Sequence, residues 1–485
     1  MRRWFVRLFL LLTVFSVFVI AEEATPANAA ATRAWTGAVD LKWSTPGNWN
    51  PVGAPVNGDS VFFLASASGK TVTNDLVNLN LASVFIDPAM TITGNTLGIS
   101  TAVIFYGTGV IWMDLPLTLG NDVQISVQDG GQIELRKSQP GVGQLALNTN
   151  GHTLTFPGEG VAILNGDLIG GGEIHVNSGT LNFAAPVSYT GTIFGGPDAS
   201  FQIFQEVPFD PTSGCSSARN TRFVLSGSSF GIYCAASVAS FAGEGLVSLY
   251  GGSSLTLTGT PGASFNGEFT GAANRSIFCC GTGVQTLTGT SAFSGNVVVS
   301  GGMLAFDGAT FPSTSKFTVT NGTLAGYGSF GDTTMTGGAL LLGPVNGRFG
   351  LAKFVAIQFA PEVHVRFVIE GAEAGLNFTQ MVMSDQTVLD SAVLELDFGG
   401  YSPPNGQAIT LVKGAPSLFG TFKGLPEGAN FTVGSLKFKI TYKGGSGHDV
   451  IITSLGSNAT PTATPTPVPG ARPFKRYVPM VAVDR

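Results

Sequence analysis

The sequence predicts an all-β protein whose short strands stack into a solenoid. Glycine makes up 67 of the 485 residues, about twice the ~7% of average proteins, so the chain turns often and cannot build long helices. Hydrophobic residues reach 44% and charged residues only 11%, which excludes a disordered chain and suits a large core. Degenerate repeats of ~20 to 30 residues complete the pattern, because stacking units of this length are typical of solenoids.

The first element is a predicted secretory signal peptide over residues 1–29. Two arginines precede an apolar stretch from Trp4 to Ile20, which is shorter than the ~20 residues of a comfortable membrane span. Ala27-Asn28-Ala29 has the small-x-small pattern of a cleavage site. A retained N-terminal anchor is the alternative, because the acidic residues before this motif leave the cleavage position open. Either way we expect an exported body, with no membrane span in the mature chain.

Residues 30–343 are predicted to form the repeat body. The clearest unit runs from Thr286 to Gly308, and its second half recurs from Val176, from Val319 and from Met335. In each copy an apolar or β-branched strand meets a glycine turn, and a leucine then begins the next strand. Because one unit is too small to bury its own apolar face, the units must stack. With a rise of ~4.8 Å each, ~14 to 20 coils would form a rod.

Residues 344–455 are predicted to be terminal coils or a β cap. From Val363 to Glu370 every second side chain is apolar and its neighbours are polar, and the same alternation recurs from Leu394 and from Leu436. This alternation predicts strands with one solvent-facing side. Such a segment would shield the last open strand edge, which would otherwise offer its backbone to other chains.

Residues 456–485 are predicted to be a disordered tail. The segment SNATPTATPTPVPG is an extended Thr/Pro-rich linker, because proline lacks the backbone donor and threonine stays solvated. A basic patch at Arg472, Lys475 and Arg476 then precedes an apolar stretch from Tyr477 to Val481. This arrangement resembles the spacer and terminus of some exported bacterial proteins, which implies sorting or surface attachment. An unstructured tail without such a role is the equal alternative.

Three segments of the body resemble the autotransporter-associated β-strand repeat of bacterial passenger domains. They are AWTGAVDLKWSTPGNWNPVGAPVNGDSVFF from Ala34, the unit from Thr286 to Gly308, and the segment from Phe422 to Thr453. The resemblance implies a right-handed parallel β-helix at or beyond the cell surface, used in adhesion or as a carrier stalk, and it implies no single biochemical activity. The chain ends in Arg485 without the family's membrane barrel, so we do not expect it to translocate itself.

Four cysteines lie in the middle of the chain, and none belongs to a C-x-x-C motif. Zinc is therefore not expected. An even number of cysteines in an exported protein permits disulfides, in three possible connectivities, of which Cys215 to Cys234 would join neighbouring turns. The partners of Cys279 and Cys280 stay open. Free buried thiols that pack as small hydrophobic groups are the alternative.

Candidate catalytic groups are few. None of the four histidines lies in a nucleophile motif. Asp167 and Glu173 flank a glycine run and form a weak candidate for an acid/base pair across a turn, with no cation beside them. The segment from Gly444 to Ile452 fits one copy of a calcium-binding nonapeptide, but that motif binds calcium between tandem copies. We therefore predict no catalytic residue, no cofactor and no metal site.

Three tryptophans near the start of the body have two interpretations. Trp35, Trp43 and Trp49 could stack on sugar rings, because indoles are large amphipathic platforms. They could instead close the open end of the core, which is the interpretation that we favour.

Charge and composition narrow the function. The formal net charge is -6, and without the net +1 of residues 1–29 the mature chain carries -7. A polyanion needs clustered basic residues, so nucleic acid is not an expected partner. We predict a secreted or surface-attached protein with a structural, adhesive or passenger-display role and no catalytic activity. Its expected partners are cell-surface or extracellular matrix components, polysaccharides among them. The alternative is a carbohydrate-active enzyme, a polysaccharide lyase or hydrolase.

Overall fold

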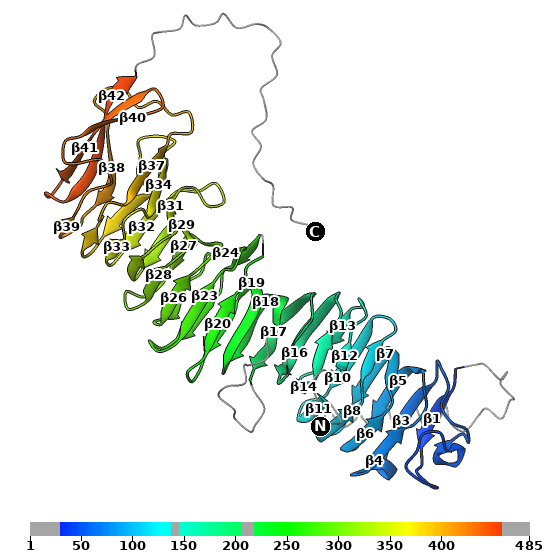
Figure 1. Cartoon of the computed structure of the whole chain (residues 1–485). Coiled ribbons are helices and arrows are strands. Elements are labelled where there is room, and N and C mark those ends of the chain that lie inside the picture. Colours follow the sequence, from blue (N-terminus) through cyan, green and yellow to red (C-terminus); the bar gives the residue numbers. More distant parts are fainter. Residues whose placement is uncertain (1–29, 137–144, 186, 205–217, 261, 458–485) are drawn as a thin grey trace, which may run out of the picture.

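The computed structural model describes residues 30–136, 145–185, 187–204, 218–260 and 262–457. These residues form one elongated parallel β-solenoid of about 14 turns (Figure 1), so the predicted all-β solenoid is confirmed. Two 3-10 turns, η1 (Pro46–Asn48) and η2 (Ala65–Ala67), are the helical elements of the described part. No helix in these ranges is long and apolar enough to cross a membrane. The predicted signal peptide and almost all of the predicted tail lie outside the described residues.

Strands at equivalent positions of successive coils pair in parallel and form three sheets along the solenoid. We call these sheets stacks 1, 2 and 3, in the order in which the chain passes through them in each coil. Coils repeat along the chain, so that β10, β11 and β12 pair with β13, β14 and β15 of the next coil. The strands of stack 1 alone are β1 (Thr32–Trp35), β3 (Ser60–Phe63), β10 (Val123–Val127), β13 (Leu154–Phe156), β21 (Ala263–Phe265), β24 (Val284–Leu287), β31 (Ala339–Leu342), β34 (His364–Val368) and β37 (Val393–Asp397).

The other two stacks follow the same parallel pairing. Stack 2 alone contains β4 (Thr71–Asn74), β6 (Met90–Gly94), β8 (Gly109–Asp114), β11 (Gly131–Arg136), β14 (Val161–Asn165), β22 (Glu268–Gly271), β25 (Ala292–Phe293), β32 (Leu351–Phe354), β35 (Gln380–Met383) and β38 (Ala408–Lys413). Stack 3 alone contains β9 (Leu117–Leu119), β12 (Leu145–Asn148), β15 (Asp167–Ile169), β20 (Ser254–Leu257), β23 (Ser276–Cys279), β26 (Asn296–Val299), β28 (Lys316–Val319), β30 (Asp332–Met335), β33 (Ile357–Phe359), β36 (Thr387–Val388) and β39 (Leu418–Phe419).

Longer strands bend through a corner and belong to more than one stack. They are β5 (Leu79–Ile86), β7 (Leu97–Phe105), β16 (Glu173–Phe183), β17 (Thr192–Ile203), β18 (Ala218–Ile232), β19 (Ala235–Leu249), β27 (Met303–Thr310) and β29 (Thr323–Phe330). Glycine allows several of these bends, as at Gly179 in β16, whose φ is 76°.

The core is a column of side chains that repeat at equivalent positions. Val61, Val84, Val103 and Ile125 occupy one register position in four successive coils, and all are buried. Alternate side chains of most strands point inward in this way, since successive residues of a strand face opposite sides. Because each coil packs only on its neighbours, the column is stable as a stack and not coil by coil.

Glycine also permits close approach between coils. A Cβ atom added at Gly331 would lie 1.8 Å from the backbone oxygen of Ser315 in the preceding coil. We expect Gly331→Ala to lower the free energy of unfolding by about 1–3 kcal/mol, because the coils must move apart. The matched control is Gly252→Ala, where no atom lies within 4 Å of the added carbon. Chemical denaturation of both variants is the measurement, and equal midpoints would contradict the close packing of these coils.

The two ends of the solenoid are closed differently. At the N-terminal end, β2 (Trp49–Asn50) pairs antiparallel with β1, and three tryptophans cover the first coil. At the C-terminal end, parallel coils continue through β39. An antiparallel meander of β40 (Asn430–Val433), β41 (Leu436–Gly444) and β42 (Asp449–Ser457) then joins β38. The segment 344–455 therefore contains both coils and an antiparallel end structure (Figure 1).

Candidate functional site

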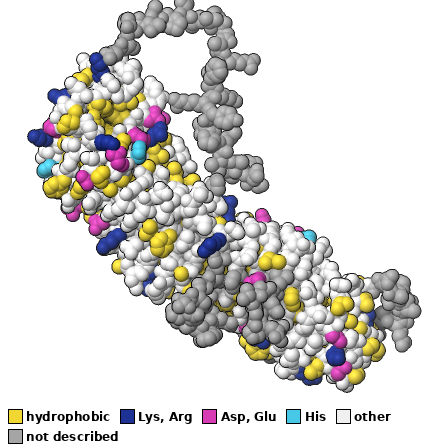
Figure 2. Space-filling model, viewed as in Figure 1, with side chains coloured by type: hydrophobic (Ala, Val, Ile, Leu, Met, Phe, Trp, Pro, Cys, Tyr) yellow, Lys and Arg dark blue, Asp and Glu magenta, His cyan; other side chains and the backbone are white. Residues whose placement is uncertain are grey.

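Charged side chains gather over the C-terminal coils of stack 1 (Figure 2). Three ion pairs lie there. The His364 Nδ1 to Glu395 Oε1 distance is 2.6 Å, and the Arg366 guanidinium lies 2.7 Å from Asp397 Oδ2. Lys423 Nζ and Glu362 Oε1 form the third pair, at 2.5 Å. We call this set the C-terminal ion pairs.

Alternation along the strand explains why these groups face outward. In β34 the side chains of Val365 and Phe367 are buried, whereas His364 and Arg366 are exposed. The predicted wet face of this segment is thus confirmed. The paired side chains are about half exposed, so each pair adds at most ~1 kcal/mol to stability. Their main effect is on the charge of the surface, because each basic side chain has a carboxylate beside it.

A groove adjoins these ion pairs at the open edge of β37. Within the described residues β37 pairs only with β34. The groove is lined by polar and apolar residues, which are Arg366, Glu395, Leu396, Asp397, Phe398, Gly399, Gly400, Tyr401, Ser402, Val433, Gly434, Ser435 and Leu436. An open groove of this kind suits binding of an extended chain. Its two carboxylates already have partners, since Glu395 bonds to His364 and Asp397 to Arg366.

The acid/base pair considered from the sequence is not formed. Glu173 bonds instead to His175, two residues further along β16, with 2.8 Å between Oε2 and Nε2. Asp167 begins β15 in stack 3, whereas Glu173 begins the stack 1 part of β16. The turn between them therefore separates the two carboxylates onto different faces.

The segment that fits one copy of the calcium nonapeptide has a structural use for its carboxylate. Asp449 is 7% exposed, and its Oδ1 accepts a hydrogen bond of 2.8 Å from the backbone N–H of Gly414. This bond ties the start of β42 to the end of β38. No group of three or more metal-ligating side chains occurs among the described residues.

The three tryptophans lie inside the core. Trp35, Trp43 and Trp49 are 1%, 0% and 1% exposed, and Trp49 meets the other two rings edge to face. Trp49 Nε1 also donates a 2.8 Å hydrogen bond to the Trp43 carbonyl oxygen. The weak prediction of a sugar platform is therefore wrong here, because no ring face is accessible. The structure supports the alternative, in which the indoles close the first coil.

The cysteines are oxidised in the described part of the chain. Cys279 and Cys280 form a disulfide between adjacent residues, and Cys234 is also disulfide-bonded. No free cysteine occurs in the described ranges. Cys215 lies outside the described residues.

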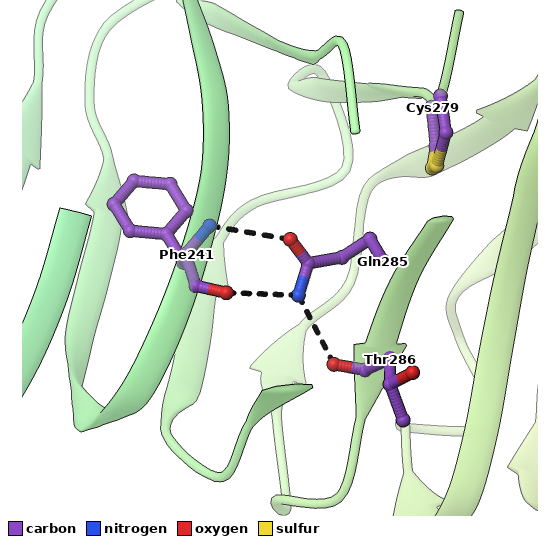
Figure 3. Close-up of a disulfide and its surroundings, with 5 residues drawn as sticks. Phe241, Cys279, Gln285 and Thr286 are labelled. Carbon is purple, nitrogen blue, oxygen red and sulfur yellow. Dashed lines mark hydrogen bonds between the residues drawn. A yellow bond between two sulfur atoms is a disulfide. The ribbon is translucent and has the colours of Figure 1, made fainter. Parts of the chain in front are cut away.

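Near the Cys279–Cys280 pair, Gln285 points into the core with its side chain fully buried (Figure 3). Its Oε1 accepts from the Phe241 N–H at 3.2 Å, and its Nε2 donates to the Phe241 and Thr286 carbonyl oxygens, both at 3.0 Å. Since β21 pairs with β19 only at Gly243, the amide of Gln285 replaces a missing strand partner for Phe241.

Sequence reasoning missed a polar cluster on stack 2. It comprises Trp112 and Asp114 of β8, Glu134 and Arg136 of β11, and Asn165 of β14, which we call the Trp112 cluster. Trp112 pairs with Glu134 in register, and Arg136 pairs with Asn165. The signal in the sequence is a 22-residue spacing, since Trp112 and Asp114 precede Glu134 and Arg136 by one coil. That spacing is informative only once the coil length is known.

Comparison with models of known protein families finds no match to this chain, and comparison with curated proteins finds none either.

Proposed function

We propose that this protein is an exported, non-catalytic β-helical rod that acts at or beyond the cell surface in structural support, adhesion or display. The observation that carries the proposal is the unbroken stack of about 14 coils, whose outer hydroxyl groups bond to one another from coil to coil. Such hydroxyl pairs are Ser200 with Ser229 at 3.1 Å, Ser248 with Thr270 at 2.8 Å and Thr290 with Thr310 at 3.1 Å.

These pairs favour a scaffold because the hydroxyl groups serve the neighbouring coil. The pairs lie on β17 to β29, where the outer surface carries little charge (Figure 2). A rod of this kind separates its two ends by on the order of 70 Å, from about 14 coils at ~4.8 Å each. Export is supported by the signal-peptide pattern of residues 1–29 and by the disulfides, which persist in oxidising compartments.

The test of the non-catalytic proposal is turnover. We expect the purified protein to release no reducing and no unsaturated sugars from a panel of neutral and acidic polysaccharides. Protease treatment of intact cells checks export separately, since an exported rod is accessible to protease and an internal protein is protected. Reproducible release of sugars would contradict the non-catalytic proposal.

The second candidate function is a carbohydrate-active enzyme, and the Trp112 cluster is the observation that favours it. Asp114 and Glu134 are two carboxylates on adjacent coils, as acid/base chemistry requires. Burial raises the pKa of Asp114, with Arg136 opposing this rise and Glu134 adding to it. If turnover is found, the double variant Asp114→Asn/Glu134→Gln must abolish it for this candidate to hold.

A further inference from the structure

The register of stack 2 aligns polar side chains in two ladders along the rod. One ladder contains Thr91, Trp112, Glu134, Ile163 and Asn182, in five successive coils. The second ladder, two residues further along each strand, contains Thr93, Asp114, Arg136 and Asn165. Because side chains alternate along a strand, both ladders share the outward face. The Trp112 cluster is where aromatic, acidic and basic groups of the two ladders meet.

Trp112 and Arg136 form the accessible part of the cluster. The guanidinium carbon of Arg136 lies 5.2 Å from the centre of the Trp112 ring, and both side chains are half-buried. This contact fixes the planar guanidinium against the indole. The charge of Arg136 also acts on Asp114, where it opposes the rise in pKa that burial causes.

The acidic part of the cluster has unused hydrogen-bond acceptors. Asp114 Oδ1 is sealed from solvent and has no donor. Glu134 is only 8% exposed, and its Oε1 accepts a 3.1 Å hydrogen bond from Asn165 Nδ2. Two coils beyond Glu134 in the same ladder, Asn182 is also 8% exposed and its Oδ1 has no donor. Of these side chains, Glu134 keeps some solvent exposure and has a second carboxylate oxygen, so a ligand hydroxyl can donate to it.

We propose that the Trp112 cluster is a binding subsite for a neutral glycan. Trp112 and Arg136 stacked on it together present a half-exposed amphipathic surface against which a sugar can pack. Glu134 accepts hydrogen bonds from sugar hydroxyls, and Arg136 donates to sugar oxygens. Two carboxylates against one guanidinium disfavour an acidic glycan. The subsite deepens the adhesive role proposed above and rests on it.

The experiment is affinity electrophoresis of the full chain in gels that contain a neutral β-glucan, a neutral galactomannan, polygalacturonate or chitosan. We expect a neutral polysaccharide to retard the protein and polygalacturonate to leave it unretarded. Trp112→Ala should weaken the retardation roughly tenfold, which corresponds to about 1.4 kcal/mol of binding free energy. Glu134→Gln keeps the shape of the side chain and removes its charge, so it tests the same site if Trp112→Ala disturbs folding.

The matched control is Phe85→Ala on stack 1, where Phe85 is also half-buried and stacks on Phe62 at 4.3 Å. Phe85→Ala should leave the retardation unchanged. The proposal is overturned if no neutral glycan binds, if only polygalacturonate or chitosan binds, or if the control weakens binding as much as Trp112→Ala. Failure of glycan binding and failure of the proposed function are distinguishable. The proposed function fails if the protein releases sugars or if intact cells protect it from protease.

Discussion

Replacing Trp49 by alanine is expected to lower the free energy of unfolding of the N-terminal coils by about 3–5 kcal/mol. The change removes a fully buried ring that meets Trp35 at 5.0 Å and Trp43 at 5.8 Å between ring centres. It also removes the hydrogen bond that Trp49 Nε1 donates to the Trp43 carbonyl oxygen. Hydrogen exchange is the measurement, since coils that pack only on their neighbours lose protection locally.

The test compares hydrogen exchange at the two ends of the solenoid. Exchange should accelerate over β1, β3 and β5, while β34 to β38 at the opposite end keep their protection. Val52→Ala is the control, because Val52 follows Trp49 closely but is 77% exposed. If Trp49→Ala changed exchange no more than Val52→Ala does, the indoles would not close the first coil.

Replacing Gln285 by methionine is expected to cost about 2–5 kcal/mol, although the side chain keeps nearly the same volume. The variant leaves the buried N–H and C=O of Phe241 without their hydrogen bonds from Gln285, and each unpaired group costs about 1–3 kcal/mol. Denaturant unfolding followed by circular dichroism measures the loss. A repeat protein can unfold in more than one step, so the transition of the middle coils should move to lower denaturant.

Gln132→Met is the matched control for this variant. Gln132 lies on the outward side of β11 and is half-buried, so the same substitution removes no core hydrogen bond there. We expect its unfolding midpoint to stay within ~0.5 kcal/mol of the parent protein. Equal effects of the two variants would show that the amide of Gln285 does not hold the strands together.

Local patterns predicted the fold well, because a β-solenoid is built from short-range alternation. The alternation from Val363 to Glu370 correctly assigned the buried and the solvent-facing side chains of β34. The plug of three tryptophans was one of two interpretations, since composition alone does not tell whether an indole lies inside or outside the first coil. Turns were harder. A short glycine run between Asp167 and Glu173 suggested proximity, whereas the corner there sends the two strands into different stacks.

The Trp112 cluster was beyond sequence reasoning for a different physical reason. Its members meet through the register between coils, and that register depends on the length of every turn. Trp112 and Glu134 are 22 residues apart and Ile163 and Asn182 only 19, yet both pairs are neighbours in register. Because the coils differ in length, no fixed period places Glu134 beside Trp112. The resemblance to passenger-domain repeats stays a prediction, since no family match supports or opposes it.

The two ends of the solenoid differ in chemistry, and they bound its length. An indole seal at one end and a crossed antiparallel meander at the other present unlike surfaces to a second molecule. The length of the solenoid therefore depends on the number of coils in one chain. Duplication or deletion of an interior coil would change this length in steps of ~4.8 Å, while both end structures are retained.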